Sequence, residues 1–219
     1  MKAIVYVAVA LIAAAAGFGI YRYAIEPNRP VGESPAATAQ EASPAAGEAA
    51  TPVPTALPDF TLAGLDGTPR SILSWPGKSM IVNFWATWCA PCRREIPLLK
   101  RLQQEHGAEG FQVVGVAVDF REDVIKYAQE IGIDYPVLIG EQDGLEAVNK
   151  FGQGSLGFPF TVFTDNRGRI VVFHVGEIHQ EEADVLLGAV NQVNRGELTP
   201  EAARVVVAKQ LAKLDAAGS

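Results

Sequence analysis

The pattern of apolar and polar positions changes at about residue 57, after which short apolar runs alternate with amphipathic stretches. The runs at 80–85 and 111–119 are continuously apolar, which is typical of strands buried on both faces. The run at 135–140 predicts a further short strand. Two β-rich runs within 160–177, separated by Asp, Asn and Gly, predict a hairpin.

Helical periodicity appears between these runs. It predicts helices over 92–107, 121–132, 144–152 and 181–194. Strands that alternate with helices indicate an α/β layer with parallel strands, and the late hairpin adds an antiparallel edge. We therefore expect an α/β fold from residue 57 onward.

The last part of the chain, 196–219, predicts one more helix. Thr199 can cap it, and Pro200 suits its first turn. Val207, Leu211 and Leu214 share one face of this helix. We expect the face to pack on the domain; docking of a partner is the alternative.

The N-terminal part has a different composition. Nineteen uncharged residues lie between Lys2 and Arg22, and as a helix they would span about 28 Å, close to the hydrocarbon thickness of a bilayer. They predict a transmembrane signal anchor over residues 1–26, or a cleaved signal peptide with small-residue cleavage sites at 13–16. In either case the rest of the chain is exported.

Residues 27–56 are half Pro and Ala and contain no aromatic residue. Such a segment cannot bury enough apolar surface to offset its ordering entropy, so it predicts a linker. The expected organisation is an anchor (1–26), a linker (27–56), an α/β domain (57–195) and a C-terminal helical extension (196–219).

The charge and the histidines exclude several functions. The net charge of −7 argues against a nucleic-acid partner. None of the three histidines stands at metal-ligand spacing from another histidine or from a cysteine, which argues against a conventional zinc site. No haem or nicotinamide motif occurs, so no cofactor is expected.

The only two cysteines, Cys89 and Cys92, stand in the stretch WCAPC. Such a pair can be half a zinc site, a structural bridge or a redox dithiol. The redox use is favoured because the pair follows a buried strand and opens a helix, whose N-terminus stabilises a thiolate. We assign Cys89 as the attacking thiol and Cys92 as the resolving thiol; Pro91 fits the first turn of the helix.

At these residues the sequence resembles the thioredoxin superfamily, and within it the membrane-anchored TlpA/ResA/DsbE-like thiol–disulfide oxidoreductases. The resemblance rests on "VNFWATWCAPC", on Pro97 and on "GFPFTVFTDNRGRI", and it covers about 57–195. It implies a thioredoxin-like fold with a central βα insertion, for which 120–140 has the right length and pattern.

The resemblance also implies a substrate surface. The family's cis-proline, which faces the disulfide across the cleft, maps onto Pro159, after Phe158. A cis bond before proline is physically accessible. The expected substrate-binding residues are Trp88, Ala90, Pro91, Phe158 and Pro159. Trp85 could line the site or pack in the core.

Proton transfer needs a separate assignment. Thioredoxin carries a buried aspartate six residues before its first cysteine; here Asn83 stands there and cannot take a proton. Glu95 lies three residues after Cys92, on the same helical face, where ResA-like proteins have a glutamate, so it is expected to handle the proton. The alternative is a glutamate that only complements the helix dipole. Arg93 and Arg94 could lower the thiol pKa values or lie on the solvated face.

The resemblance implies a reductant of protein disulfides, with apocytochrome c or disulfides of copper-centre assembly among the candidate substrates. It implies a single-pass protein of the inner membrane, with its catalytic domain on the periplasmic side and a membrane electron donor as partner. One alternative is a DsbA-type oxidant, which usually has histidine where Pro91 stands. The other is a Cu(I)-binding module that delivers copper through the two thiolates.

Overall fold

The computed structural model describes residues 54–152 and 157–218. The expected anchor and all but the last three residues of the expected linker lie outside the described residues. Within the described ranges, no helix is both long enough and apolar enough to cross a bilayer.

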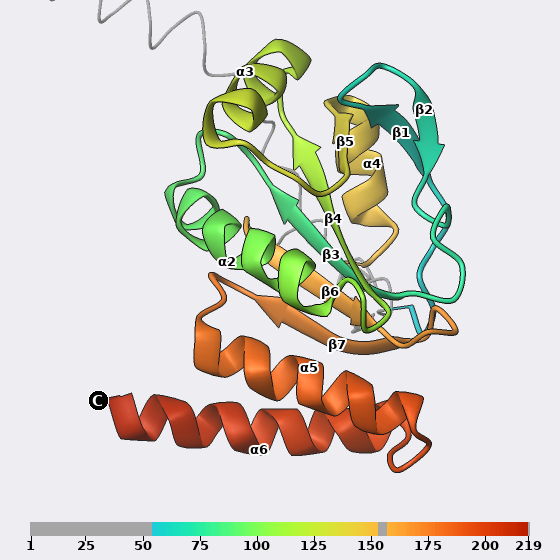
Figure 1. Ribbon diagram of the computed structural model, residues 1–219, viewed down its shortest axis with the longest axis vertical. Helices are drawn as coiled ribbons and strands as arrows, with labels where there is room; N and C mark the ends of the chain where they lie inside the picture. Colours follow the sequence, from blue (N-terminus) through green and yellow to red (C-terminus); the bar gives the residue numbers. More distant parts are fainter. Residues whose placement is uncertain (1–53, 153–156, 219) are drawn as a thin grey trace, which may run out of the picture. The chain divides into compact units, whose positions relative to one another are not determined.

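One mixed sheet forms the centre of the described part, with the strand order β2-β1-β5-β4-β3-β6-β7 (Figure 1). β3 pairs in parallel with β4, and β4 pairs in parallel with β5, whereas β6 and β7 are antiparallel. The strands are β1 (Thr61–Gly64), β2 (Pro69–Ser71), β3 (Ser79–Trp85), β4 (Phe111–Val118), β5 (Val137–Gly140), β6 (Phe160–Thr164) and β7 (Ile170–Val175).

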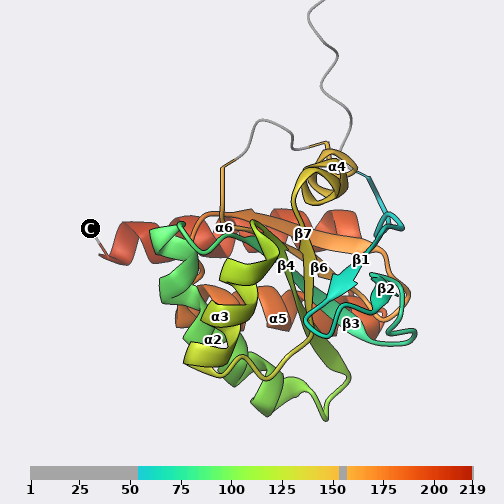
Figure 2. The same ribbon diagram turned by 90° about the horizontal axis from the view of Figure 1, so that it is seen from above.

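Helices cover both faces of this sheet. They are α2 (Ala90–His106), α3 (Arg121–Ile131), α4 (Gln142–Asn149), α5 (Gln180–Asn194) and α6 (Pro200–Gly218). α2, α3 and α5 share one apolar core with the sheet, and α4 packs in a second core on the opposite face (Figure 2). The parallel strands, the antiparallel hairpin and the helix and strand expected within 120–140 are confirmed.

β3 explains how the sheet holds two cores. All seven of its residues are buried, and successive side chains point to opposite faces. Ile81 and Trp85 belong to the core under α2, whereas Val82 and Phe84 belong to the core under α4. Asn83 lies on the same side as Ile81 and Trp85, so a polar group is placed beneath the helix that carries the cysteines.

Two features differ from the sequence-based expectation. Residues 61–71 form the β1–β2 hairpin, and β1 pairs antiparallel with β5, so the second edge of the sheet is also antiparallel. The ordered contacts begin before residue 57: the Ile170 amide donates to the Thr55 carbonyl at 2.8 Å, and Ala56 pairs with Arg169. Composition could not indicate this, because backbone pairing at a sheet edge needs no apolar side chain.

The C-terminal helix packs on the domain, as expected. Ala202 N donates to the Thr199 hydroxyl at 3.2 Å, which caps α6. Val207 is buried in the core, and Leu211 packs against it. Arg204 donates to the carbonyls of Ile170 and Val171, at 2.6 and 3.2 Å, and so satisfies acceptors on the edge strand β7.

Candidate active site

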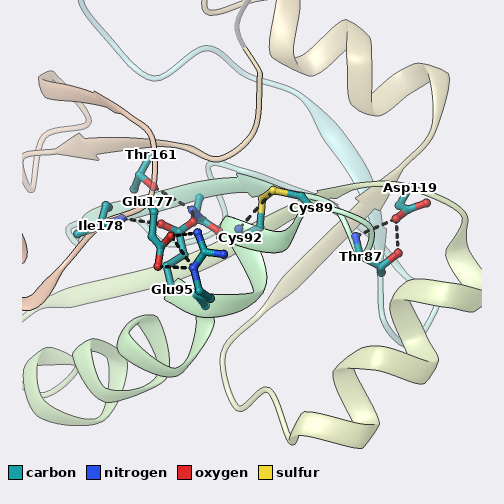
Figure 3. The surroundings of a disulfide bond; sticks show 10 residues. Thr87, Cys89, Cys92, Glu95, Asp119, Thr161, Glu177 and Ile178 are labelled. Atoms are coloured by element: carbon teal, nitrogen blue, oxygen red, sulfur yellow. Dashed lines mark hydrogen bonds and ion pairs between the residues drawn. A yellow bond between two sulfur atoms is a disulfide. The ribbon is translucent and has the colours of Figure 1, made fainter.

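The two cysteines lie where β3 ends and α2 begins, and they form a disulfide with 5.3 Å between their Cα atoms (Figure 3). Cys89 is the N-cap of α2, and its sulfur accepts the Cys92 amide at 3.3 Å. Cys89 is 4% exposed and Cys92 is fully buried. The more accessible sulfur therefore stands at the positive end of the helix dipole, which favours its thiolate when the pair is reduced.

The loop before the cysteines is fixed by a residue that sequence reasoning missed. Asp119, directly after β4, accepts the Thr87 amide at 2.9 Å and the Thr87 hydroxyl at 2.5 Å (Figure 3). β3 and β4 are parallel neighbours, so their carboxyl ends meet at one edge of the sheet. A polar residue at the end of the second parallel strand was the signal that could have identified Asp119.

Glu95 lies on the buried side of α2 and is only 1% exposed. One carboxylate oxygen accepts Asn83 Nδ2 at 2.7 Å, and the other accepts the Ile178 amide at 3.0 Å. Burial raises the pKa of Glu95 to about 7; the two hydrogen bonds lower it, and the charges of Glu177 and Glu182 raise it further.

Asn83 connects this carboxyl to the sheet. Its Nδ2 donates both to Glu95 and, at 2.9 Å, to the Thr161 hydroxyl on β6 (Figure 3). Asn83 cannot take a proton itself. It instead orients the Glu95 carboxyl, whose pKa burial raises to about 7.

Arg94 and Glu177 form an ion pair beside this carboxyl. Arg94 Nε donates to a Glu177 oxygen at 2.9 Å, and Glu177 precedes Ile178, whose amide binds Glu95. The pair thus joins α2 to the loop that supplies a hydrogen bond to Glu95 (Figure 3). Arg93 lies with its guanidinium 5.1 Å from the centre of the Tyr127 ring. Both arginines are exposed, which agrees with the expected place on the solvated face of the helix. Each also makes a specific contact that the sequence did not reveal.

Trp88 is 70% exposed, and its ring centre lies 6.1 Å from that of Phe158. The Phe158–Pro159 bond is cis, as expected. Ala90 is exposed and Pro91 is half-buried, whereas Trp85 is fully buried and belongs to the core. Phe120, after Asp119, is 65% exposed, and sequence reasoning had not singled it out.

Comparison with known proteins agrees with this geometry. A family model described as Redoxin matches residues 52–187. The chain belongs to the Redoxin family. Its relatives include the thiol-disulfide oxidoreductase ResA of Geobacillus thermodenitrificans, which is 32% identical over 131 residues, 59% of this chain and 73% of the relative.

Two further likenesses point the same way. The thioredoxin-like protein YneN of Bacillus subtilis is 34% identical over 131 residues, which cover 58% of this chain and 74% of YneN. A solved structure from Chlorobium tepidum, described as a thiol:disulfide interchange protein DsbE, is 27% identical with a TM-score of 0.57, over 63% of this chain and 96% of that one. This Redoxin chain is a thiol–disulfide oxidoreductase of the ResA and DsbE type with a thioredoxin-like fold, and Cys89 and Cys92 stand at its active-site position.

Proposed function

We propose that this oxidoreductase is a reductant of protein disulfides in an exported, membrane-tethered form. The observation that carries the proposal is Glu95, a buried carboxyl with a pKa of about 7, three residues after Cys92 on the same side of α2. A base at this place assists attack by Cys92 on a mixed disulfide. A reductant makes that attack in every cycle.

The reaction follows from the positions of the groups. The Cys89 thiolate attacks one sulfur of the substrate disulfide, that S–S bond breaks, and the other substrate sulfur leaves as a thiolate. Cys92 then gives its proton to the Glu95 carboxylate, and the Cys92 thiolate attacks the Cys89 sulfur. The second substrate thiolate leaves, the substrate is reduced by two electrons, and the Cys89–Cys92 disulfide forms.

The substrate contact is assigned to the surface around the disulfide. Trp88 offers an exposed aromatic ring and Phe158 a half-buried one, with the exposed Ala90 and the half-buried Pro91 in the same surface; Pro159, which follows Phe158, is buried. These groups suit an extended polypeptide that presents a disulfide at Cys89. Cysteines of apocytochrome c before haem attachment are one proposed substrate.

The first property to test is the direction of electron transfer, that is, whether the protein reduces or oxidises its substrates. Proline stands between the cysteines where strong oxidants of the DsbA type usually have histidine, so the reduction potential should lie nearer to about −270 mV than to about −120 mV. Equilibration with glutathione, followed by tryptophan fluorescence, gives the value. A potential on the oxidising side would refute the assignment as a reductant.

The role of Glu95 has a separate test. Glu95→Gln keeps the shape of the side chain and removes its proton chemistry, so disulfide reduction should be slower by about 10²-fold or more near neutral pH. The exposed Glu105→Gln on the same helix is the matched control. If Glu95→Gln reduces disulfides at the parent rate at every pH, the carboxyl is not the base.

Export and tethering are proposed from the sequence. We propose that residues 1–26 anchor the chain in the inner membrane and that 27–56 act mainly as a tether. The domain would then face the periplasm, where a membrane protein re-reduces its disulfide. A mature protein that keeps its first residues and stays with membranes after a high-salt wash supports this. A mature N-terminus near residue 16, in a soluble fraction, would refute the anchor.

A Cys92→Ala variant should trap substrates as mixed disulfides with Cys89.

A further inference from the structure

A groove of about 350 Å³ lies between α2 and α3, and its lining on α2 begins at Arg93, the residue after Cys92. Arg93, Lys100 and Arg101 line it from α2, and Tyr127 lines it from α3. The exposed Pro97 adds apolar surface, and the fully buried Ile96 lies beneath the groove. The groove therefore combines three cations with an aromatic ring and an apolar wall, and no carboxylate lines it.

The three cations of the groove have no carboxylate partner within the described part of the chain. Arg93 lies over the Tyr127 ring. Lys100 Nζ donates to the Ile131 carbonyl at 2.8 Å, and Arg101 donates to Gln180 at 3.4 Å. These contacts use neutral partners, so the positive charge of the groove is not compensated at contact distance.

The charge of this groove contrasts with the charge of the chain. The whole sequence carries a net charge of −7, yet the charged residues of α2 before Glu105, apart from the buried Glu95, are all cations. One of them, Arg94, is paired with Glu177. α3 contributes the acids Glu122, Asp123 and Glu130, but none of them lines the groove.

We propose that this groove binds an acidic segment of the polypeptide whose disulfide the enzyme reduces. The inference rests on the proposed function, because it requires a polypeptide substrate at Cys89. Acidic side chains of the substrate would pair with Lys100 and Arg101, and neighbouring apolar side chains would contact Pro97 and Tyr127. Opposite charges on the two surfaces speed the encounter and fix its register.

The helix geometry sets the distance at which the acidic residue should stand. Lys100 is eleven positions after Cys89, which corresponds to about 16 Å along the helix axis. An extended chain covers that length in about five residues. A substrate with Asp or Glu about five residues from the attacked cysteine therefore matches the groove.

The test uses the reduced full chain, purified in a non-ionic detergent, and two synthetic peptides. Each peptide has one internal disulfide and the same apolar residues; one carries Glu and the other carries Lys about five residues outside each cysteine. The second-order rate constant of reduction is measured at about 20 mM and about 300 mM salt. The acidic peptide should react about five- to tenfold faster at low salt, and the preference should shrink at high salt.

Charge variants locate this preference. Lys100→Gln with Arg101→Gln should abolish most of it, and Arg101→Gln alone, which leaves the Lys100 hydrogen bond intact, should reduce it. The matched control is Lys209→Gln with Lys213→Gln, two exposed lysines of α6, which should leave the preference unchanged.

Two results would overturn the inference. The parent could reduce both peptides equally at low salt, or the Lys100 and Arg101 variants could keep the full preference. In both cases the enzyme still reduces peptide disulfides, so the proposed function stands. If the parent reduces neither peptide, the proposed function fails and this inference fails with it.

Discussion

Glu95→Gln should change the free energy of unfolding with opposite signs at low and at high pH. The pKa of Glu95 is raised from 4.5 to about 7 in the folded protein, chiefly by burial. The folded state therefore binds more protons than the unfolded state between these two values, and stability is lost as the pH rises through this window. At about 1.4 kcal/mol per pKa unit, the loss is about 3 kcal/mol above the folded pKa.

The substituted glutamine carries no such proton linkage. Near pH 4 the parent carboxyl is protonated, and its carbonyl and hydroxyl oxygens can still accept from Asn83 and Ile178, whereas the NH2 group of glutamine can accept from neither. The loss of one hydrogen bond costs about 1 kcal/mol. Glu95→Gln should therefore be less stable than the parent by about 1 kcal/mol near pH 4, and more stable by about 2 kcal/mol near pH 8.

The assay is urea unfolding of the oxidised full chain at about pH 4, 6 and 8, followed by tryptophan fluorescence. Trp85, which is fully buried, reports loss of the core. Glu105→Gln, at an exposed position of the same helix, should follow the parent at each pH. A Glu95→Gln difference that does not change with pH would show that Glu95 is not the carboxyl whose ionisation is suppressed by burial.

Three other substitutions test particular contacts. Glu177→Gln removes a charge that raises the pKa of Glu95, so the inflection in the pH dependence of disulfide reduction should move to lower pH. Arg204→Met removes the donors to two carbonyls of β7 and should cost about 2 kcal/mol in urea unfolding. Gly115→Ala places a Cβ 2.9 Å from Trp85 Nε1, so it should cost about 1–3 kcal/mol and shift the tryptophan emission.

Each of these substitutions has a matched control. Asp184→Asn, at an exposed carboxylate of α5, should leave the pH inflection in place. Lys209→Met, on the same helix as Arg204, should leave stability within about 0.5 kcal/mol. Gly188→Ala has open space around the new Cβ and should be neutral or stabilising. If a control matches its test variant, the corresponding contact does not have the assigned effect.

The features of the site that depend on near neighbours in the chain could be predicted from the sequence. Cys89 at a helix N-terminus follows from an apolar run that ends in WCAPC, because strand burial and helix capping depend on near neighbours in the chain. Apart from β1 and β2, the strands and helices of the domain and the β6–β7 hairpin were predicted within a few residues. The resemblance placed a cis bond before Pro159, and the structure has it.

The environment of Glu95 was decided by the tertiary structure. Its partners Asn83 and Ile178 stand 12 and 83 positions away in the chain, and periodicity within α2 carries no information about either. The packing of β3, β6 and the loop after β7 around one carboxyl removes it from water, and that removal raises its pKa. The sequence could propose Glu95 as a proton carrier, but only the assembled core makes its pKa suitable for the task, because desolvation depends on every element packed around the group.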